Sequence, residues 1–188
     1  MEALISSTIA VTIAEIGDKS HLLSLFLASR FTRRNAIIAG ILAATLFNHT
    51  VSAWLGVWLL KVIPPGMAPW LISASFLLIA FWLLFPDRNE EGSGRFDRFG
   101  PFIATTILFF LVEIGDKTQV ATIVLAAKYS QTSLVIVGTT LGMVIANLPV
   151  VFAGGWIMRK IPLNYARWTA FALFLAMGVV TIYSAVAG

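Results

Sequence analysis

Two charged hexapeptides interrupt long apolar stretches of this 188-residue chain. Residues 15–20 read Glu-Ile-Gly-Asp-Lys-Ser, and residues 113–118 read Glu-Ile-Gly-Asp-Lys-Thr. The chain is 59% hydrophobic with a mean hydropathy of +0.89, which is above the range of soluble domains, so we expect an integral membrane protein. An ionisable side chain placed in hydrocarbon costs about 2.5 kcal/mol or more, and it therefore marks a functional site by default.

The apolar stretches predict an all-α membrane protein with six transmembrane helices. A helix needs about 20 residues to cross the hydrocarbon core, and spans fit at roughly 4–27, 36–60, 68–85, 101–127, 133–158 and 165–187. The one sizeable polar segment, 87–100, predicts a cytoplasmic linker between two three-helix repeats, 1–86 and 101–188.

The two halves are an internal duplication. At an offset of 98 residues, 18 of the 67 positions between Glu15 and Phe81 are identical, and these include rare Trp, Pro and Gly residues. Because each half has an odd number of spans, the second half enters the membrane from the opposite side, and the repeats are inverted. Inverted repeats are typical of secondary transporters, whose ion site lies near the bilayer midplane where the repeats meet.

The distribution of Lys and Arg predicts that both termini lie outside the cytoplasm. Loops on the side opposite to the termini carry nine basic residues: Arg30, Arg33, Arg34, Arg88, Arg95, Arg98, Arg159, Lys160 and Arg167. Loops on the same side as the termini carry two, Lys61 and Lys128. This scatter between spans is what membrane topology requires, and it argues against a nucleic-acid partner despite a pI of about 9.8. The absence of cysteine excludes disulfides and thiolate metal sites.

Each hexapeptide places two carboxylates together. On a continuous helix, positions i, i+3 and i+4 share a face, so the glutamate, aspartate and lysine of each motif should point the same way. Gly17 and Gly115 lie between the acids and either admit a neighbouring helix or let the helix bend. In a purely structural interpretation, each lysine pairs with the glutamate of its own motif to neutralise the span, which leaves Asp18 and Asp116 unexplained.

If the repeats bring the motifs together, four carboxylates and two lysines leave a charge of −2, which one divalent cation neutralises. Oxygen donors suit hard cations such as Ca²⁺, Mg²⁺ or Mn²⁺. Without metal the crowded carboxylates take up protons, and this competition is the simplest route to metal/proton antiport. We therefore expect the metal ligands to be Glu15, Asp18, Glu113 and Asp116.

Nine further polar residues near the motifs or inside the spans are expected to have accessory or gating roles. His21 occupies the place of Gln119 and offers a borderline nitrogen donor, which would bias the site modestly towards a transition metal. For the asparagines an interhelical hydrogen bond is an equally good interpretation, and for His49 a proton-handling role competes with a structural one. The nine residues are Lys19, Lys117, Ser20, Thr118, Gln119, His21, Asn48, His49 and Asn147.

The paired hexapeptides in a chain of this size resemble the MneA-type cation/proton exchanger family of bacterial manganese exporters and Golgi manganese/calcium transporters. The resemblance covers nearly the whole chain, including Asn48-His49 and Ala146-Asn147-Leu148-Pro149. It implies Mn²⁺ export by the motif acids, with Ca²⁺ as the alternative ion, from a bacterial inner membrane and without a cofactor. The family usually has Gln after both hexapeptides, and His21 departs from that pattern.

Two other functions remain open from the residues alone. A metal-dependent membrane enzyme acting on a lipid phosphate would use clustered carboxylates to hold Mg²⁺, but it needs phosphate-binding basic residues near headgroup depth. An amino-acid exporter would offer its lysines to a substrate carboxylate, which four acids would repel. Self-association into a homo-oligomer also remains open.

Overall fold

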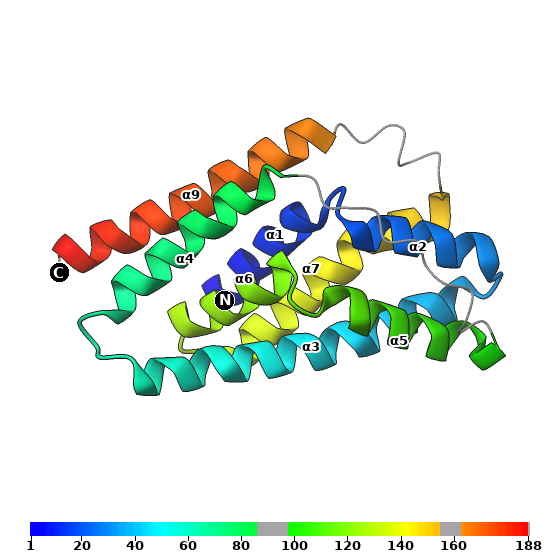
Figure 1. The fold of residues 1–188 in the computed structure, drawn as a ribbon, viewed down its shortest axis with the longest axis horizontal. Helices are drawn as coiled ribbons and strands as arrows, with labels where there is room; N and C mark the ends of the chain where they lie inside the picture. Colours follow the sequence, from blue (N-terminus) through cyan, green and yellow to red (C-terminus); the bar gives the residue numbers. More distant parts are fainter. Residues whose placement is uncertain (86–97, 155–162, 188) are drawn as a thin grey trace.

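The protein is a bundle of α-helices in a computed structural model, which describes residues 1–85, 98–154 and 163–187. Within these ranges there is no β-strand. Most of the predicted linker, 87–97, lies outside the described residues. The helices are α1 (Glu2–Glu15), α2 (Lys19–Arg30), α3 (Arg34–Val62), α4 (Ala68–Leu83), α5 (Gly100–Glu113), α6 (Lys117–Lys128), α7 (Thr132–Ala153) and α9 (Leu163–Ala187) (Figure 1).

Several of these helices suit a lipid environment. α3, α7 and the 167–187 part of α9 are long and apolar enough to cross a membrane, and α4 and α5 are shorter apolar helices. Large apolar side chains cover the outward faces of α3, α4 and α9, among them Trp54, Leu78 and Tyr183, each more than 70% exposed. Such surfaces are covered by lipid in a membrane protein, so the predicted all-α membrane class agrees with the structure.

Two of the predicted spans, 4–27 and 101–127, are each divided into two helices at the charged motif. α1 ends at Glu15 and α2 begins at Lys19, while α5 ends at Glu113 and α6 begins at Lys117. Gly17 and Gly115 have φ values of +82° and +75°, a conformation that glycine adopts without steric cost. The expectation that each motif lies on one face of a continuous helix is therefore wrong. A Cβ added at Gly115 would meet no atom within 4 Å, so that glycine serves the backbone turn rather than close helix packing.

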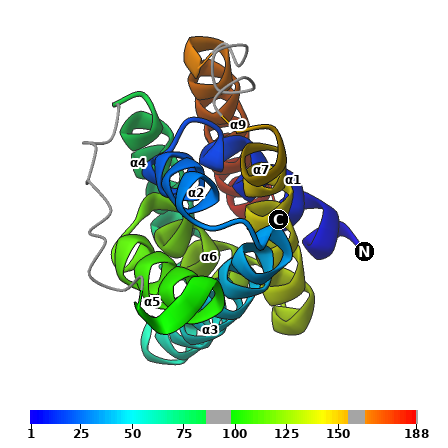
Figure 2. The same cartoon turned by 90° about the vertical axis from the view of Figure 1, so that its right-hand side faces the viewer.

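The two broken helices run in opposite directions. α1 and α2 lead from the end that carries the termini towards the opposite end, whereas α5 and α6 return, so the two breaks face each other in the middle (Figure 1). α1 packs on α7, α4 on α9, and α3 on both α5 and α6. Viewed along the bundle, α3 and α5 lie on one side and α4 and α9 on the other (Figure 2).

Matching glycines allow equivalent close contacts in the two halves. A Cβ added at Gly40 would lie 2.7 Å from the Thr105 Cβ, and one added at Gly138 would lie 3.0 Å from the Ser7 Cβ. Gly40 and Gly138 are related by the 98-residue offset, and so are Ser7 and Thr105. The contact between α3 and α5 thus has a counterpart between α7 and α1, and a small residue permits close approach in both.

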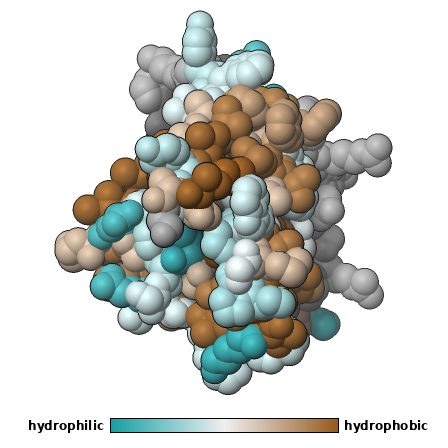
Figure 3. Space-filling model, turned by 90° about the vertical axis from the view of Figure 1, so that its left-hand side faces the viewer, coloured by the Kyte–Doolittle hydropathy of each residue, from teal (hydrophilic) through white to brown (hydrophobic). Residues whose placement is uncertain are grey.

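The packing is less symmetric at the periphery. α4 packs on α6 and α9 packs on α1, whereas no comparable contact between described residues joins α5 to α4 or α2 to α9. Near the end that carries the termini, Lys128 Nζ lies 5.4 Å from the centre of the Phe76 ring, and the Tyr129 hydroxyl lies 3.5 Å from Glu2 Oε1. Figure 3 shows this end, where polar side chains lie among apolar ones.

Candidate metal centre

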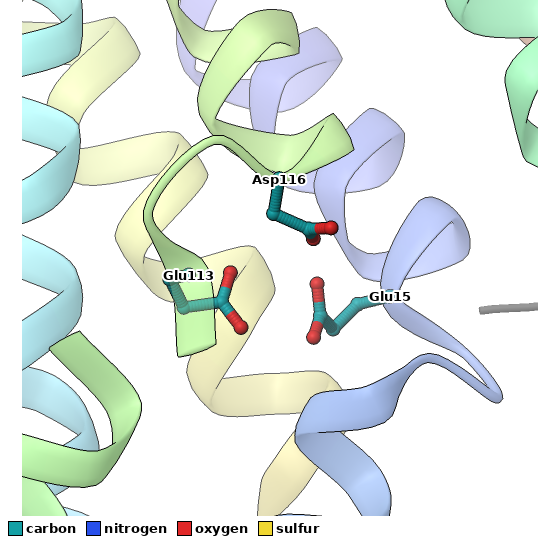
Figure 4. A group of neighbouring side chains, drawn as sticks. All are labelled: Glu15, Glu113 and Asp116. Atoms are coloured by element: carbon teal, nitrogen blue, oxygen red, sulfur yellow. The ribbon is translucent and has the colours of Figure 1, made fainter. Parts of the chain in front are cut away.

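Three carboxylates from the two motifs meet inside the bundle. Glu15, Glu113 and Asp116 are buried, and each contributes an oxygen that lies within 4.8 Å of the other two. Glu15 ends α1, Glu113 ends α5, and Asp116 immediately precedes α6. Figure 4 shows the three carboxyl groups pointing towards one another. Three of the four carboxylates that were expected to converge, from motifs almost a hundred positions apart, therefore form one group.

The distances within this group suit a small hard cation. Three oxygens that all lie within 4.8 Å of one another leave a point that is no more than about 2.8 Å from each of them, where a cation could lie. Ca²⁺ binds oxygen ligands at about 2.3–2.6 Å, so only small movements would close the site around such an ion. One oxygen of each carboxyl group, Glu15 Oε2, Glu113 Oε1 and Asp116 Oδ2, is buried without a hydrogen-bond partner among the described residues. Buried acceptors of this kind require an explanation, and a bound cation or proton supplies one.

The broken helices also contribute their backbone dipoles. The carboxyl-terminal ends of α1 and α5 lie at Glu15 and Glu113. A helix carries a partial negative charge at this end, so two helix ends add to the attraction for a cation. Discontinuous helices use their ends in the same way at the ion sites of membrane transporters.

Hydroxyl groups orient the two glutamates in equivalent ways. Ser20 Oγ donates a hydrogen bond to Glu15 Oε1, and Thr118 Oγ1 donates one to Glu113 Oε2 at 3.0 Å. All four residues are buried. Each hydroxyl holds one carboxylate oxygen and leaves the other without a hydrogen bond, so Ser20 and Thr118 position the glutamates.

The two lysines form ion pairs across the motifs. Lys19 Nζ lies 3.4 Å from Asp116 Oδ1, and Lys117 Nζ lies 3.6 Å from Asp18 Oδ1. The structural interpretation of the sequence predicted pairs within each motif, and the crossed pairs contradict it. The helix break explains the difference, because it separates each glutamate from the lysine that would follow it by one turn. Asp18, although expected to be a metal ligand, lies outside the group of three carboxylates and pairs with Lys117, the residue that follows Asp116.

His21 and Gln119 accept hydrogen bonds from the glycines of the breaks. The Gly17 amide donates to His21 Nδ1 at 3.1 Å, and the Gly115 amide donates to Gln119 Oε1 at 2.7 Å. His21 is buried but does not belong to the acidic group. Its expected contribution of a metal-binding nitrogen therefore finds no support in this arrangement.

The asparagines of α3 and α7 form hydrogen bonds to neighbouring helices. Asn48 Nδ2 donates to the Phe110 carbonyl oxygen of α5 at 3.3 Å, and Ser24 Oγ of α2 donates to Asn147 Oδ1 at 2.7 Å. These bonds agree with the interhelical interpretation of both asparagines. His49 is 1% exposed, and its Nδ1 has no hydrogen-bond partner among the described residues. The sequence analysis missed Ser24, although a hydroxyl, Thr122, stands at the equivalent position.

A small cavity reaches the crossed ion pair from the side where α4 ends and α9 begins. Asp18, Lys117, Phe85 and Arg167 are among its lining residues. Lys117 Nζ also donates to the Phe85 carbonyl oxygen at 3.4 Å. The sequence analysis counted Arg167 only as a loop charge and did not consider Phe85. The position of Arg167 at the start of the last span was the one signal that could have identified it.

Comparisons with known proteins find relatives that match most of the chain. The family model described as "Divalent cation/proton antiporter GDT1" matches residues 3–91 and 101–188. A Vibrio cholerae protein named "Putative manganese exporter" is 47% identical over 184 residues, which cover 97% of this chain and 92% of that protein. "GDT1-like protein 3" of Oryza sativa subsp. indica is 26% identical over 95% of this chain and 72% of its own length, and a Synechocystis GDT1-like protein is 24% identical over all of both chains. No solved structure matches.

The matches confirm the resemblance drawn from the hexapeptides. A cation/proton antiporter is a transporter, so the family assignment excludes the membrane-enzyme alternative. Together, the family model and the Vibrio relative extend over nearly the whole chain. The chain therefore belongs to the GDT1 family of divalent cation/proton antiporters.

Proposed function

We propose that this protein exports Mn²⁺ from the bacterial cytoplasm across the inner membrane in exchange for protons. The family supplies divalent cation/proton antiport, and the name of the Vibrio relative supplies manganese. The observation that carries the proposal is the group of buried oxygens from Glu15, Glu113 and Asp116. Such a group has no evident structural use of its own, because three carboxylates at this distance repel one another even with Lys19 beside Asp116.

Proton exchange follows from the same group. Three carboxylates that water does not reach must be neutralised either by a cation or by protons. Binding of a divalent ion therefore releases protons from the oxygens that it occupies, and departure of the ion lets them return. Lys19 and Lys117, paired with the two aspartates, reduce the repulsion when the metal has left.

We propose that the helices form six membrane crossings in two inverted three-helix repeats, 1–86 and 101–188. The broken spans α1–α2 and α5–α6 are then equivalent crossings, and their opposite directions support this assignment (Figure 1). The excess of Arg and Lys in one set of loops supports an orientation in which both termini lie outside the cytoplasm. In this orientation the cavity at Asp18 and Lys117 opens towards the cytoplasm, from which the exported ion enters.

Asp18 and Asp116 both belong to the proposed ion pathway. Asp116 contributes an oxygen to the acidic group in the observed arrangement, and Asp18 lines the small cavity that we propose as the approach route of the ion. Alternating access exchanges the conformations of two inverted repeats. Asp18 is therefore proposed to replace Asp116 beside the glutamates when the site faces the opposite side.

Purified protein in liposomes that contain a divalent-sensitive dye and a pH dye tests the proposal. Addition of Mn²⁺ should produce metal entry with opposite proton movement, and Glu113→Gln should abolish both. Ca²⁺ and Mg²⁺ added in turn establish ion preference, with Ca²⁺ transport in place of Mn²⁺ overturning the choice of ion. Metal flux without proton movement would overturn antiport, and undiminished flux in Glu113→Gln would overturn the site.

A further inference from the structure

The side chain four residues after the glycine of each helix break accepts a hydrogen bond from that glycine, but the accepting atom differs between the two repeats. Gly17 and Gly115 begin the turns that separate the half-helices, and their amide groups point to His21 Nδ1 and Gln119 Oε1. An imidazole nitrogen in one repeat thus replaces an amide oxygen in the other. The two residues are related by the 98-residue offset.

We propose that His21 and Gln119 are positioning residues that hold the two helix breaks in the geometry required for metal binding. Each residue accepts the glycine N–H and thereby ties the turn to the first turn of the following helix. In the sequence, the aspartate of each motif lies between the glycine that donates this hydrogen bond and the residue that accepts it. Asp18 and Asp116 are therefore fixed in place by the acceptors through the backbone of the turn.

The backbone geometry supports this equivalence. Asp18 has φ −78° and ψ 172°, and Asp116 has φ −81° and ψ 166°. The preceding glycines are similarly close, at φ +82° and +75°. A ring and a flexible amide thus accompany nearly identical turns. The property that the two side chains share is an acceptor atom within reach of the glycine amide, and this is the property that the turn requires.

The proposal assigns His21 a defined chemical state. A ring nitrogen that accepts a hydrogen bond must carry a lone pair, so the proton of the neutral imidazole lies on Nε2. Nδ1 is then engaged and is not available to a metal ion. His21 can take the place that Gln119 has in the other repeat because the turn needs its acceptor rather than its metal affinity.

The two sites differ in their access to water, which gives an asymmetric expectation. His21 is 1% exposed, whereas Gln119 is only partly buried and Gly115 is exposed. A lost acceptor can be replaced by water more readily at Gly115 than at Gly17. Removal of the acceptor should therefore be more damaging at His21 than at Gln119.

The test uses four variants in the full-length protein. His21→Gln and Gln119→His retain an acceptor, whereas His21→Leu and Gln119→Met remove it and keep most of the side-chain volume. Two quantities are measured: the half-saturating Mn²⁺ concentration for transport in liposomes, and hydrogen–deuterium exchange in peptides that contain Gly17 or Gly115. The transport measurement depends on the proposed function, whereas the exchange measurement reports the break whether or not the protein transports Mn²⁺.

The acceptor-retaining variants should remain within about twofold of wild type in both measurements. His21→Leu should raise the half-saturating concentration about tenfold and Gln119→Met about threefold, with maximal rate less affected and exchange faster at the altered break. If His21→Gln is as impaired as His21→Leu, the imidazole itself is required and the proposal is overturned. Wild-type behaviour of both acceptor-free variants would overturn it as well.

If His21→Leu fails to fold, His21→Gln and Gln119→His still test the proposal, because both variants retain an acceptor and should behave like wild type. If wild-type protein does not move Mn²⁺ but exchange changes as expected, the proposed function fails while the positioning role stands. If wild type transports Mn²⁺ and exchange at Gly17 is unchanged in His21→Leu, the positioning role fails alone.

Discussion

Replacement of Asp116 by Asn separates metal ligation from simple ion pairing. Asp116 contributes an oxygen to the group with Glu15 and Glu113, and it also lies 3.4 Å from Lys19. Asn has nearly the same shape and keeps one oxygen, so the substitution removes the negative charge with little change in volume. If Asp116 is a ligand, the substitution weakens metal binding. If it serves only to neutralise Lys19, removal of that lysine should compensate.

The expected magnitude follows from the burial of the group. Asp116 is 3% exposed, so water replaces little of the lost interaction. Removal of one partner from a buried charge interaction costs about 2–5 kcal/mol. This corresponds to a rise of at least about thirtyfold in the half-saturating Mn²⁺ concentration. A smaller effect is expected from Glu2→Gln, which removes an exposed carboxylate at the amino terminus and serves as the control.

The assay compares Asp116→Asn, Lys19→Met and the double variant in liposomes, together with thermal unfolding in detergent. The single Asp116→Asn change leaves Lys19 without its aspartate and should lower thermal stability as well as transport. The double variant removes both charges and should recover stability, because the unpaired lysine is gone. Transport by the double variant should stay as low as in Asp116→Asn, because the third carboxylate is still missing. Recovery of both stability and transport would refute the ligand role of Asp116.

Three further outcomes are expected. Gly115→Ala should lower the free energy of unfolding by about 1 kcal/mol in thermal or denaturant unfolding, because its φ of +75° is unfavourable for a residue with a Cβ even where that atom meets no neighbour; an unchanged value would contradict the conformational role of the glycine. The half-saturating Mn²⁺ concentration should rise as pH falls, since protons and metal compete for the same carboxylates, and a value independent of pH would contradict that competition. In a chain with no native cysteine, Lys61→Cys should react with an impermeant maleimide on intact cells and Arg33→Cys only after lysis, with the reverse pattern contradicting the orientation.

The main elements of the candidate site could be predicted from the sequence because the chain contains two related halves that can be compared with each other. Matching hexapeptides at an offset of 98 residues identified the acidic residues, and the structure brings Glu15, Glu113 and Asp116 together. The same offset relates the hydroxyl–glutamate bonds of Ser20 and Thr118. In the proposed inverted repeats, equivalent residues tend to meet near the shared axis, so this convergence could be predicted without coordinates.

The expectation of continuous spans at Gly17 and Gly115 was wrong because a prediction from helical periodicity assumes an unbroken helix. Apolar residues flank Gly17 and Gly115 closely enough to suggest unbroken spans, and glycine is tolerated inside a helix at a cost of about 1 kcal/mol. Neither feature reveals whether a glycine adopts a positive φ. That choice depends on partners for the amides left free by the break, and here the partners are His21 and Gln119.

Composition and repetition in the sequence determined the membrane class, the duplicated acids and the family, because these depend only on which residues occur and at what spacing. The tertiary structure decided which groups pair. Lys19 meets Asp116 and Lys117 meets Asp18 only because two broken helices approach from opposite directions. The same approach of the two broken helices brings Asp116, and not Asp18, into the group with Glu15 and Glu113. A carboxylate's partners depend on distances of a few ångströms between segments far apart in the chain, and such distances are properties of packing.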